Sequence, residues 1–312
     1  LINEGCIVRG SDVQSSSLIS GLEKIGARIN TTQDGSFMTS ETDMVVISAA
    51  ISEDNPDLKT ARKLGIKVVK YSQILGSMMK EKQGIAISGT HGKTTTSAMI
   101  SAILRRSGFD PTFVIGGEVP DIGGNGYLGT GKFFVAEACE YDGSFLNLAP
   151  TVGVITNIEE DHLDYYENIG KIINAFGSFA SLVSPEGLLV VNKHDTNVAI
   201  AIQRANSRVE TYSLDEPSDW RGESVIGGDG VRKFKVYRKN EFFCEMSLKI
   251  PGAHNVLNAL AATAVCTFLG VDSECIKNAL ATFGGANRRF QIIGEKNSIK
   301  VIDDYAHHPT EI

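Results

Sequence analysis

The sequence predicts an α/β protein built on parallel, helix-flanked sheets. Apolar runs typical of buried strands alternate with amphipathic helical segments along almost the whole chain. The chain has 312 residues, more than one typical domain, so two or three domains are expected. One strand–helix junction also carries a glycine-rich loop that ends in Lys-Thr, at residues 89–96. Such a loop at the edge of a parallel sheet is typical of nucleotide-binding proteins.

The first predicted domain covers residues 1–80. Apolar residues in this region recur at strand and helix spacings in turn. The predicted strands are 5–12, 43–51 and 66–71, and the predicted helices are 16–29 and 55–65. The polar stretch 76–83 is the expected domain boundary. The alternation predicts a Rossmann-like fold for this domain.

The second predicted domain covers residues 81–290. Its expected strands are 84–89, 112–117, 132–138, 151–158 and 188–193, and its expected helices are 93–107, 168–183, 254–270 and 272–283. Residues 222–250 alternate apolar and polar side chains around a turn at Lys239-Asn240, which predicts antiparallel strands. A strand that begins near residue 297 then opens a third α/β domain over 291–312.

Composition restricts the classes of partner. The net charge is −7 and the pI is near 5.5, which argues against a large nucleic-acid-binding surface. No apolar run approaches the length that spans a membrane. The five cysteines show no metal-ligand spacing, and their odd number favours a reducing, cytoplasmic compartment. We therefore expect neither nucleic-acid binding nor membrane insertion.

The loop at 89–96 predicts a phosphate-binding site. Backbone N–H groups at a helix N-terminus attract anions, Lys93 would neutralise the β- and γ-phosphates, and Thr94 would ligate Mg²⁺. The loop is shorter than the usual pattern, and a tight turn with incidental Lys and Thr is the alternative interpretation. The predicted ATP-binding residues of this loop are Gly89, Thr90, His91, Gly92, Lys93, Thr94 and Thr95.

Two further strands end in polar residues that would reach the same sheet edge. Glu137 ends the strand at 132–138, where a carboxylate is the expected second ligand for Mg²⁺. Glu140 and Asp142 are its local competitors, and a solvated loop acid is the alternative. His162 follows the next strand in a polar cluster, which favours a second metal ligand or a substrate contact over a surface histidine.

The helix from residue 254 carries a polar face opposite its apolar stripe. His254, Asn255 and Asn258 share this face, where amide groups suit an adenine edge or a phosphate oxygen. Capping of the helix by Asn255 is an equally good interpretation. Arg289 could pair with phosphate or simply be solvated. Asp12, just after a strand, is a weak candidate for binding a ribose.

Together these motifs resemble those of the Mur ligases of bacterial cell-wall synthesis, over essentially the whole chain. The motifs of the central and third regions are "GTHGKTTT" (89–96), "EACEYDGSFL" (137–146), "TNIEEDHLD" (156–164), "PGAHNVLNALAA" (251–262), "NRRF" (287–290) and "DDYAHHPTE" (303–311). In the first region they are "GSD" (10–12) and "SAAISEDNP" (48–56). Six ordered motifs in the central and third regions make the resemblance specific.

The resemblance implies a first domain that binds a UDP-sugar, a central P-loop ATPase domain and the start of an amino-acid-binding domain. It implies ATP and two Mg²⁺ ions, with UDP-N-acetylmuramate and L-alanine as the substrates to be joined through an acyl phosphate. Carried over position by position, it implies catalytic roles for Lys93, Glu137 and His162, the last two as metal ligands with Thr94. ATP contacts are implied for His254, Asn255, Asn258, Arg289 and Asp303, and UDP-sugar contacts for Ser11, Asp12, Ser48 and Tyr305.

The chain also departs from the family. Cys139 and Tyr141 stand where the family member it most resembles commonly has Asp and Ser, which affects substrate contacts nearby. The family's glycine-rich UDP loop and most of its third domain are not found in the sequence, so we expect residues 1–312 alone to be inactive. Other interpretations are a sibling ligase that adds a preformed peptide, a non-catalytic nucleotide-binding module, and a kinase that releases a stable phosphorylated product.

Overall fold

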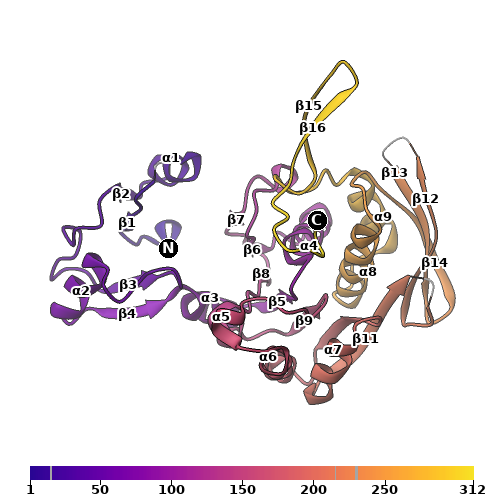
Figure 1. Ribbon diagram of the computed structural model, residues 1–312, viewed down its shortest axis with the longest axis horizontal. Coiled ribbons are helices and arrows are strands. Elements are labelled where there is room, and N and C mark those ends of the chain that lie inside the picture. The colour runs from indigo at the N-terminus through magenta and orange to yellow at the C-terminus, as the bar shows by residue number, and fades with distance from the viewer. Residues whose placement is uncertain (15, 215, 229–230) are drawn as a thin grey trace. The chain divides into compact units, whose positions relative to one another are not determined.

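The computed structural model describes residues 1–14, 16–214, 216–228 and 231–312. The chain divides into two compact units, Leu1–Ile74 and Leu75–Ile312 (Figure 1). Helix α3, Tyr71–Lys80, runs across this division. The stretch expected to be the boundary, 76–83, is therefore partly helical.

The first unit contains two pairs of parallel strands. β1 (Arg9–Ser11) pairs with β2 (Arg28–Asn30), and β3 (Met44–Ile47) pairs with β4 (Lys67–Lys70). The helices are α1 (Ser17–Lys24), α2 (Pro56–Lys63) and the short 3-10 helix η1 (Ile2–Glu4). Asn55 caps α2 by accepting a hydrogen bond from the Leu58 N–H, as expected for Asn directly before a Pro-initiated helix. The predicted α/β alternation is confirmed, but the helix expected over 16–29 ends at Lys24, and Arg28–Asn30 is the strand β2 instead.

The second unit is organised on a ten-stranded sheet with the order β14-β13-β12-β11-β10-β9-β5-β8-β6-β7. Its strands are β5 (Gln83–Ser88), β6 (Thr112–Val114), β7 (Gly126–Tyr127), β8 (Phe133–Glu137), β9 (Val152–Ile155), β10 (Leu188–Asn192), β11 (Arg208–Leu214), β12 (Trp220–Gly228), β13 (Val231–Arg238) and β14 (Glu241–Leu248). Neighbouring strands pair in parallel from β12 through β11, β10, β9, β5 and β8 to β6. At the two edges the pairing is antiparallel: β7 pairs with β6, β13 with β12, and β14 with β13. The mostly parallel sheet and the antiparallel extension are both confirmed.

Helices cover both faces of this sheet, because the buried strands are apolar on both sides. On β5, Ile85 and Ile87 belong to one hydrophobic core and Ala86, which points the other way, to a second. The first core includes residues of α4 (Lys93–Arg106), α8 (Ala253–Phe268) and α9 (Ser273–Thr282), and the second includes residues of α6 (Ile169–Leu182) and α7 (Thr196–Ala201). Short helices α5 (Leu163–Tyr166), η2 (Pro120–Ile122), η3 (Tyr141–Asn147) and η4 (Ile202–Arg204) complete the unit.

Residues 291–303 form a hairpin, of which only the second strand was predicted. β16 (Ile299–Asp303) corresponds to the expected strand, but β15 (Gln291–Lys296) pairs with it antiparallel. Asn297 and Ser298 form the turn with positive φ angles of 52° and 62°. Of the helices in the described ranges, none is both long and apolar enough to cross a membrane.

The contact between α6 and η3 in the second hydrophobic core provides a test of stability. Phe176 is fully buried, and its ring meets that of Phe145 edge-on at 5.2 Å between centroids. Phe176→Ala should lower the free energy of unfolding by about 3–5 kcal/mol, because the lost contacts leave a cavity. Phe242 is 59% exposed, so Phe242→Ala is the matched control, with an expected change within about 0.5 kcal/mol. Urea unfolding of both variants measures the difference; equal effects would contradict the assignment of this core.

Candidate active site

The predicted phosphate loop connects β5 to α4, as its sequence context requires. Gly89 and Gly92 both have positive φ, at 131° and 83°. A Cβ at Gly89 would lie 2.0 Å from Thr156 Oγ1, and one at Gly92 would lie 2.7 Å from Asn258 Oδ1. Glycine is favoured at both positions by the positive φ, and at Gly89 also because the loop is pressed against the backbone that follows β9.

Hydrogen bonds fasten this loop to the segment that follows β9. The His91 N–H donates to Asn157 Oδ1 at 2.8 Å, and the Thr90 N–H donates to the Asn157 carbonyl at 3.0 Å. The Glu159 N–H donates to Thr90 Oγ1 at 2.9 Å. The polar cluster predicted after this strand therefore lies against the loop, which confirms the expected meeting of strand ends at one sheet edge.

The Lys93 ammonium group is held by the loop and by a buried acid. It donates to the carbonyls of Gly89 and Thr90, and to Glu140 Oε1 at 3.0 Å. The Glu140 side chain is 3% exposed, and its Oε2 is buried without a hydrogen-bond partner among the described residues. The sequence analysis considered Glu140 only as an alternative to Glu137 as an Mg²⁺ ligand. In the structure, Glu140 is the acid that pairs with Lys93.

Glu137 lies beside Thr94 instead. The Thr94 hydroxyl donates to Glu137 Oε2 at 3.2 Å, and the Gly116 N–H donates to Glu137 Oε1 at 2.6 Å. Burial raises the pKa of Glu137, although the Gly116 N–H, the charge of Lys93 and the Thr94 hydroxyl act in the opposite direction. The Arg289 guanidinium lies 3.5 Å from Thr94 Oγ1. A hydroxyl, a carboxylate and a guanidinium thus meet at the start of α4.

His162 belongs to a second group of donors. His162, Asp161 and Glu140 each offer one ligand atom, and these atoms lie within 4.8 Å of one another. His162 has a left-handed backbone (φ 52°), uncommon for a non-glycine residue, and its ring lies 5.0 Å from that of Tyr141. Glu140 therefore links Lys93 to His162, and the departure at Tyr141 directly touches this group.

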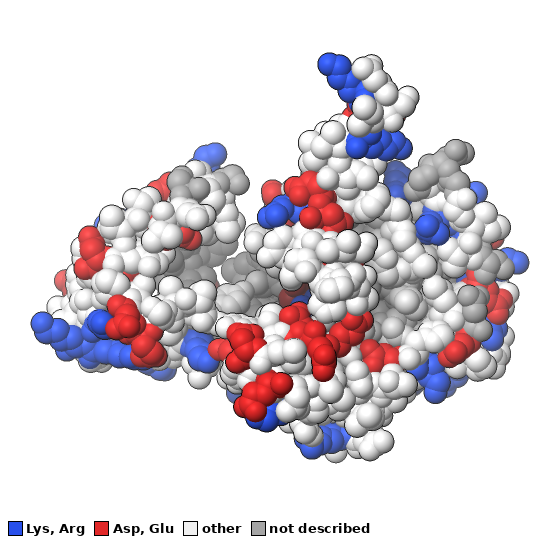
Figure 2. All heavy atoms as spheres, in the orientation of Figure 1, with Lys and Arg blue, Asp and Glu red and all other residues white. Residues whose placement is uncertain are grey.

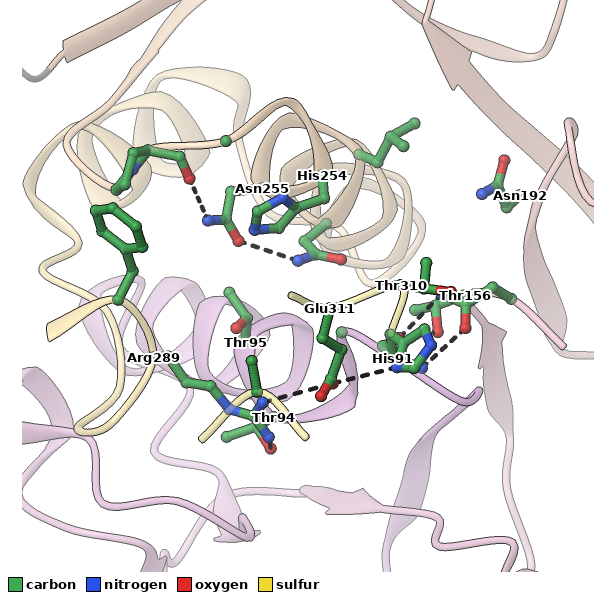
Figure 3. Close-up of a pocket in the computed structure, with 18 of the residues that line it drawn as sticks. His91, Thr94, Thr95, Thr156, Asn192, His254, Asn255, Arg289, Thr310 and Glu311 are labelled. Atoms are coloured by element: carbon green, nitrogen blue, oxygen red, sulfur yellow. Dashed lines mark hydrogen bonds and ion pairs between the residues drawn. The ribbon is translucent and has the colours of Figure 1, made fainter. Parts of the chain in front are cut away.

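A cavity of about 390 Å³ opens beside the loop (Figure 3). Most of the predicted ATP-binding residues line it: His91, Gly92, Thr94, Thr95, His254, Asn255, Asn258 and Arg289. Residues that sequence reasoning missed also line it, including Asn192, Tyr212, Asp304, Thr310 and Glu311. Asn192 could have been found, because it ends β10 at the same sheet edge as the loop.

The polar face of α8 points into this cavity (Figure 3). Asn258 Nδ2 donates to Asn255 Oδ1 at 3.1 Å, and Asn255 Nδ2 donates to the Pro251 carbonyl at 2.5 Å. The residue that caps α8 is Gly252, so the alternative that Asn255 caps the helix is wrong. Burial lowers the pKa of His254, which favours a neutral ring.

Other predicted residues lie outside the cavity lining. Asp303 lies 3.7 Å from Arg288 Nε, whereas its neighbour Asp304 lines the cavity. The Tyr305 ring lies against the guanidinium groups of Arg288 and Arg289, at 4.9 and 5.7 Å.

In the first unit, the predicted UDP-sugar contacts are Ser11, Asp12 and Ser48. The Ser11 hydroxyl donates to Asp57 Oδ2 at 2.5 Å, and Asp12 Oδ1 accepts from the Gln14 N–H at 2.9 Å. Ser48 directly follows β3. Asp57, which is buried and which the sequence did not single out, also accepts from the Gly35 N–H at 2.7 Å. A UDP-sugar role for these residues stays a prediction.

Comparison with known proteins agrees with this architecture. Residues 87–266 match the Mur ligase middle domain, and residues 1–83 match the domain described as Mur ligase family, catalytic domain. The chain is 44% identical to a UDP-N-acetylmuramate–L-alanine ligase of Caldanaerobacter subterraneus, over 100% of this chain and 68% of that protein. It is 46% identical to the enzyme of the same name from Desulforamulus reducens, over 99% of this chain and 67% of that protein.

Solved structures give the same result. The UDP-N-acetylmuramate-alanine ligase of Thermotoga maritima superposes with a TM-score of 0.88 at 30% identity, covering 99% of this chain and 71% of that one. A UDP-N-acetylmuramate:L-alanyl-γ-D-glutamyl-meso-diaminopimelate ligase from Neisseria meningitides gives 0.83 at 25% identity, covering 92% and 93%. With 42–46% identity to curated relatives over nearly its whole length, the chain belongs to the Mur ligase family.

Proposed function

We propose that this protein joins L-alanine to the lactyl carboxylate of UDP-N-acetylmuramate at the expense of ATP, in the cytoplasm, as a step of peptidoglycan synthesis. The observation that carries the proposal is the meeting of Lys93, Thr94, Glu137 and Arg289 at one sheet edge, beside a cavity large enough for a nucleotide. The names of the similar ligases support this choice of substrates.

The donor atoms present suit Mg²⁺, which prefers oxygen ligands. The Thr94 hydroxyl and the Glu137 carboxylate would hold one ion. The Oε2 of Glu140, buried and without a hydrogen-bond partner in the described part of the chain, would hold a second with Asp161 and His162. Bound Mg²⁺ would neutralise phosphate charge and polarise the phosphoryl group.

The protein's own side chains must supply positive charge at the site, because both substrates that bear phosphate are anionic. Asp and Glu side chains gather in the middle of the visible face of the second unit (Figure 2), and both ATP and the sugar nucleotide are anionic. Lys93 and Arg289 supply fixed positive charge next to the loop, where preorganised donors stabilise charge that develops on the phosphate. The loop N–H groups at the start of α4 would add to this stabilisation.

The reaction balances without a covalent intermediate on the protein. The lactyl carboxylate attacks the γ-phosphorus, the bond from the γ-phosphorus to the bridging oxygen breaks, and ADP leaves with an acyl phosphate formed. The amine of L-alanine then attacks the acyl carbon and loses a proton, a C–N bond forms, and phosphate leaves. No activated Ser or Cys nucleophile is required.

A sibling ligase that adds a preformed peptide to the same sugar nucleotide is the second candidate, because a diaminopimelate-peptide ligase also superposes closely. The test is phosphate release by the complete protein with ATP, UDP-N-acetylmuramate and either L-alanine or L-Ala-γ-D-Glu-meso-diaminopimelate. We expect faster turnover with alanine. Faster turnover with the tripeptide would contradict the proposal, and phosphate release without any amine would indicate neither ligase.

A further inference from the structure

Three side chains from separate segments converge at the phosphate loop. They are His91 in the loop, Glu159 after β9, and His308 after β16, here called the His-Glu-His cluster. Each offers one metal-ligand atom, and these atoms lie within 4.8 Å of one another. The two imidazole rings lie 4.7 Å apart between centroids. His91 also lines the nucleotide cavity, whereas Glu159 and His308 have no role in the reaction described above.

The hydrogen bonds fix which nitrogen of His91 carries the proton. His91 Nδ1 lies 3.2 Å from Glu311 Oε1, and an ionised carboxylate can only accept, so Nδ1 is the donor (Figure 3). In the neutral ring, His91 Nε2 then carries a lone pair. This atom is buried, has no hydrogen-bond partner within the described ranges, and lies 3.6 Å from Glu159 Oε2.

The same reasoning applies to His308. Its Nδ1 accepts from the Thr310 N–H at 3.2 Å, so its Nε2 is the donor to the Glu160 carbonyl, at 3.3 Å. His308 Nδ1 lies 3.8 Å from Glu159 Oε2. In the neutral ring, the His91 Nε2 lone pair therefore faces the Glu159 carboxylate oxygen, which is electrostatically unfavourable unless a cation lies between them. A cation bound at His308 Nδ1 would replace the Thr310 N–H as the partner of that lone pair.

We propose that the His-Glu-His cluster binds a divalent cation of the zinc class. Two imidazole nitrogens and a carboxylate oxygen are a typical zinc ligand set, whereas Mg²⁺ prefers oxygen alone. Tetrahedral zinc with bonds of about 2.0–2.1 Å separates its ligands by roughly 3.4 Å. The distances of 3.6 and 3.8 Å from the Glu159 oxygen need only small side-chain movements to reach that value.

The surroundings of the cluster match those of metal-bound histidines. Such histidines donate their other N–H to a carboxylate or a backbone carbonyl, as His91 does to Glu311 and His308 does to Glu160. The Thr310 hydroxyl also donates to Glu159 Oε2, at 2.6 Å, and orients that carboxylate. A bound cation would tie the segment after β16 to the phosphate loop.

The test is titration of the metal-free protein with Co²⁺ in excess Mg²⁺ and without nucleotide. We expect one equivalent to produce visible d–d absorption that Zn²⁺ abolishes by competition. His308→Gln should weaken Zn²⁺ binding by at least about 10–100-fold, and Glu311→Gln by about 10–100-fold. His194→Gln, which removes an imidazole outside the cluster, is the matched control and should bind normally.

Thermal unfolding without metal checks that each variant folds, and Glu159→Gln provides a second ligand variant if His308→Gln does not. Absence of Co²⁺ absorption, or equal affinity in His308→Gln and the control, would overturn the proposal. So would a loss of binding in His162→Gln alone, which would place the metal in the other group of donors. Because binding is measured without turnover, this outcome is independent of the proposed ligase activity.

Discussion

Replacing Lys93 with alanine should reduce alanine-dependent phosphate release by about 10²–10³-fold. The ammonium group is the fixed positive charge closest to the loop carbonyls, and removal of one preorganised donor has effects of this size in other enzymes. Phosphate release by the complete protein, with ATP and both acceptor substrates saturating, measures the loss. Unchanged turnover would refute the catalytic interpretation and favour a non-catalytic nucleotide-binding module.

The control must separate catalysis from stability. Lys93→Ala leaves the Glu140 carboxylate buried without its cation at 3.0 Å, and breaking a buried pair in this way costs about 3–5 kcal/mol. The double variant Lys93→Ala/Glu140→Gln removes the buried charge as well. We expect the double variant to regain most of the lost stability and none of the activity. Glu140→Gln alone is assayed beside it, because Glu140 is also a proposed Mg²⁺ ligand and its own effect on activity must be known. Recovery of activity together with stability would show that Lys93 acts only through folding.

Replacing Glu137 with glutamine should have opposite effects on activity and stability. Activity should fall by about 10²–10³-fold, because a neutral amide is a poor ligand for Mg²⁺ and does not balance its charge. Stability at neutral pH should rise, because the buried carboxylate no longer has to be ionised. A gain of about 1 kcal/mol would raise Tm by about 2–4 °C.

The sign follows from the raised pKa of Glu137, for which burial is the largest cause. Below the ordinary carboxyl pKa, the group is protonated in both the folded and unfolded states and stability is unaffected. As the pH rises towards the raised folded pKa, only the unfolded state ionises freely, so the wild-type protein loses stability. Thermal unfolding of wild type and Glu137→Gln from pH 4 to 8 should show Tm values that diverge with rising pH. A constant difference would contradict this origin.

The sequence was most informative where periodicity is local. Most strands of the large sheet and helices α4, α6, α8 and α9 follow from apolar spacing and capping residues such as Asp272, which accepts from the Glu274 N–H at 2.9 Å. Strands β7 and β11 were not predicted. The phosphate loop was predictable because its glycines, Lys93 and Thr94 are adjacent in the chain. Strand ends at one sheet edge also predicted that Glu137 and the 156–164 segment would approach the loop.

Contacts between segments that are distant in the chain could not be predicted from the sequence. The pairing of Lys93 with Glu140, rather than with Glu137, depends on how the chain turns after β8. His91 meets Glu311 across 220 positions of sequence, so no local pattern indicates it. Strand β15 was missed for a related reason, since its alternation is weak and its partner strand alone defines it.

The most direct test is a crystal structure of the complete protein with a non-hydrolysable ATP analogue and Mn²⁺ in place of Mg²⁺, with the ions located by anomalous scattering. We predict an ion about 2.1 Å from both Thr94 Oγ1 and a Glu137 oxygen, with the Lys93 ammonium on the phosphates. An ion bound to the phosphates but remote from Thr94 and Glu137 would contradict the account.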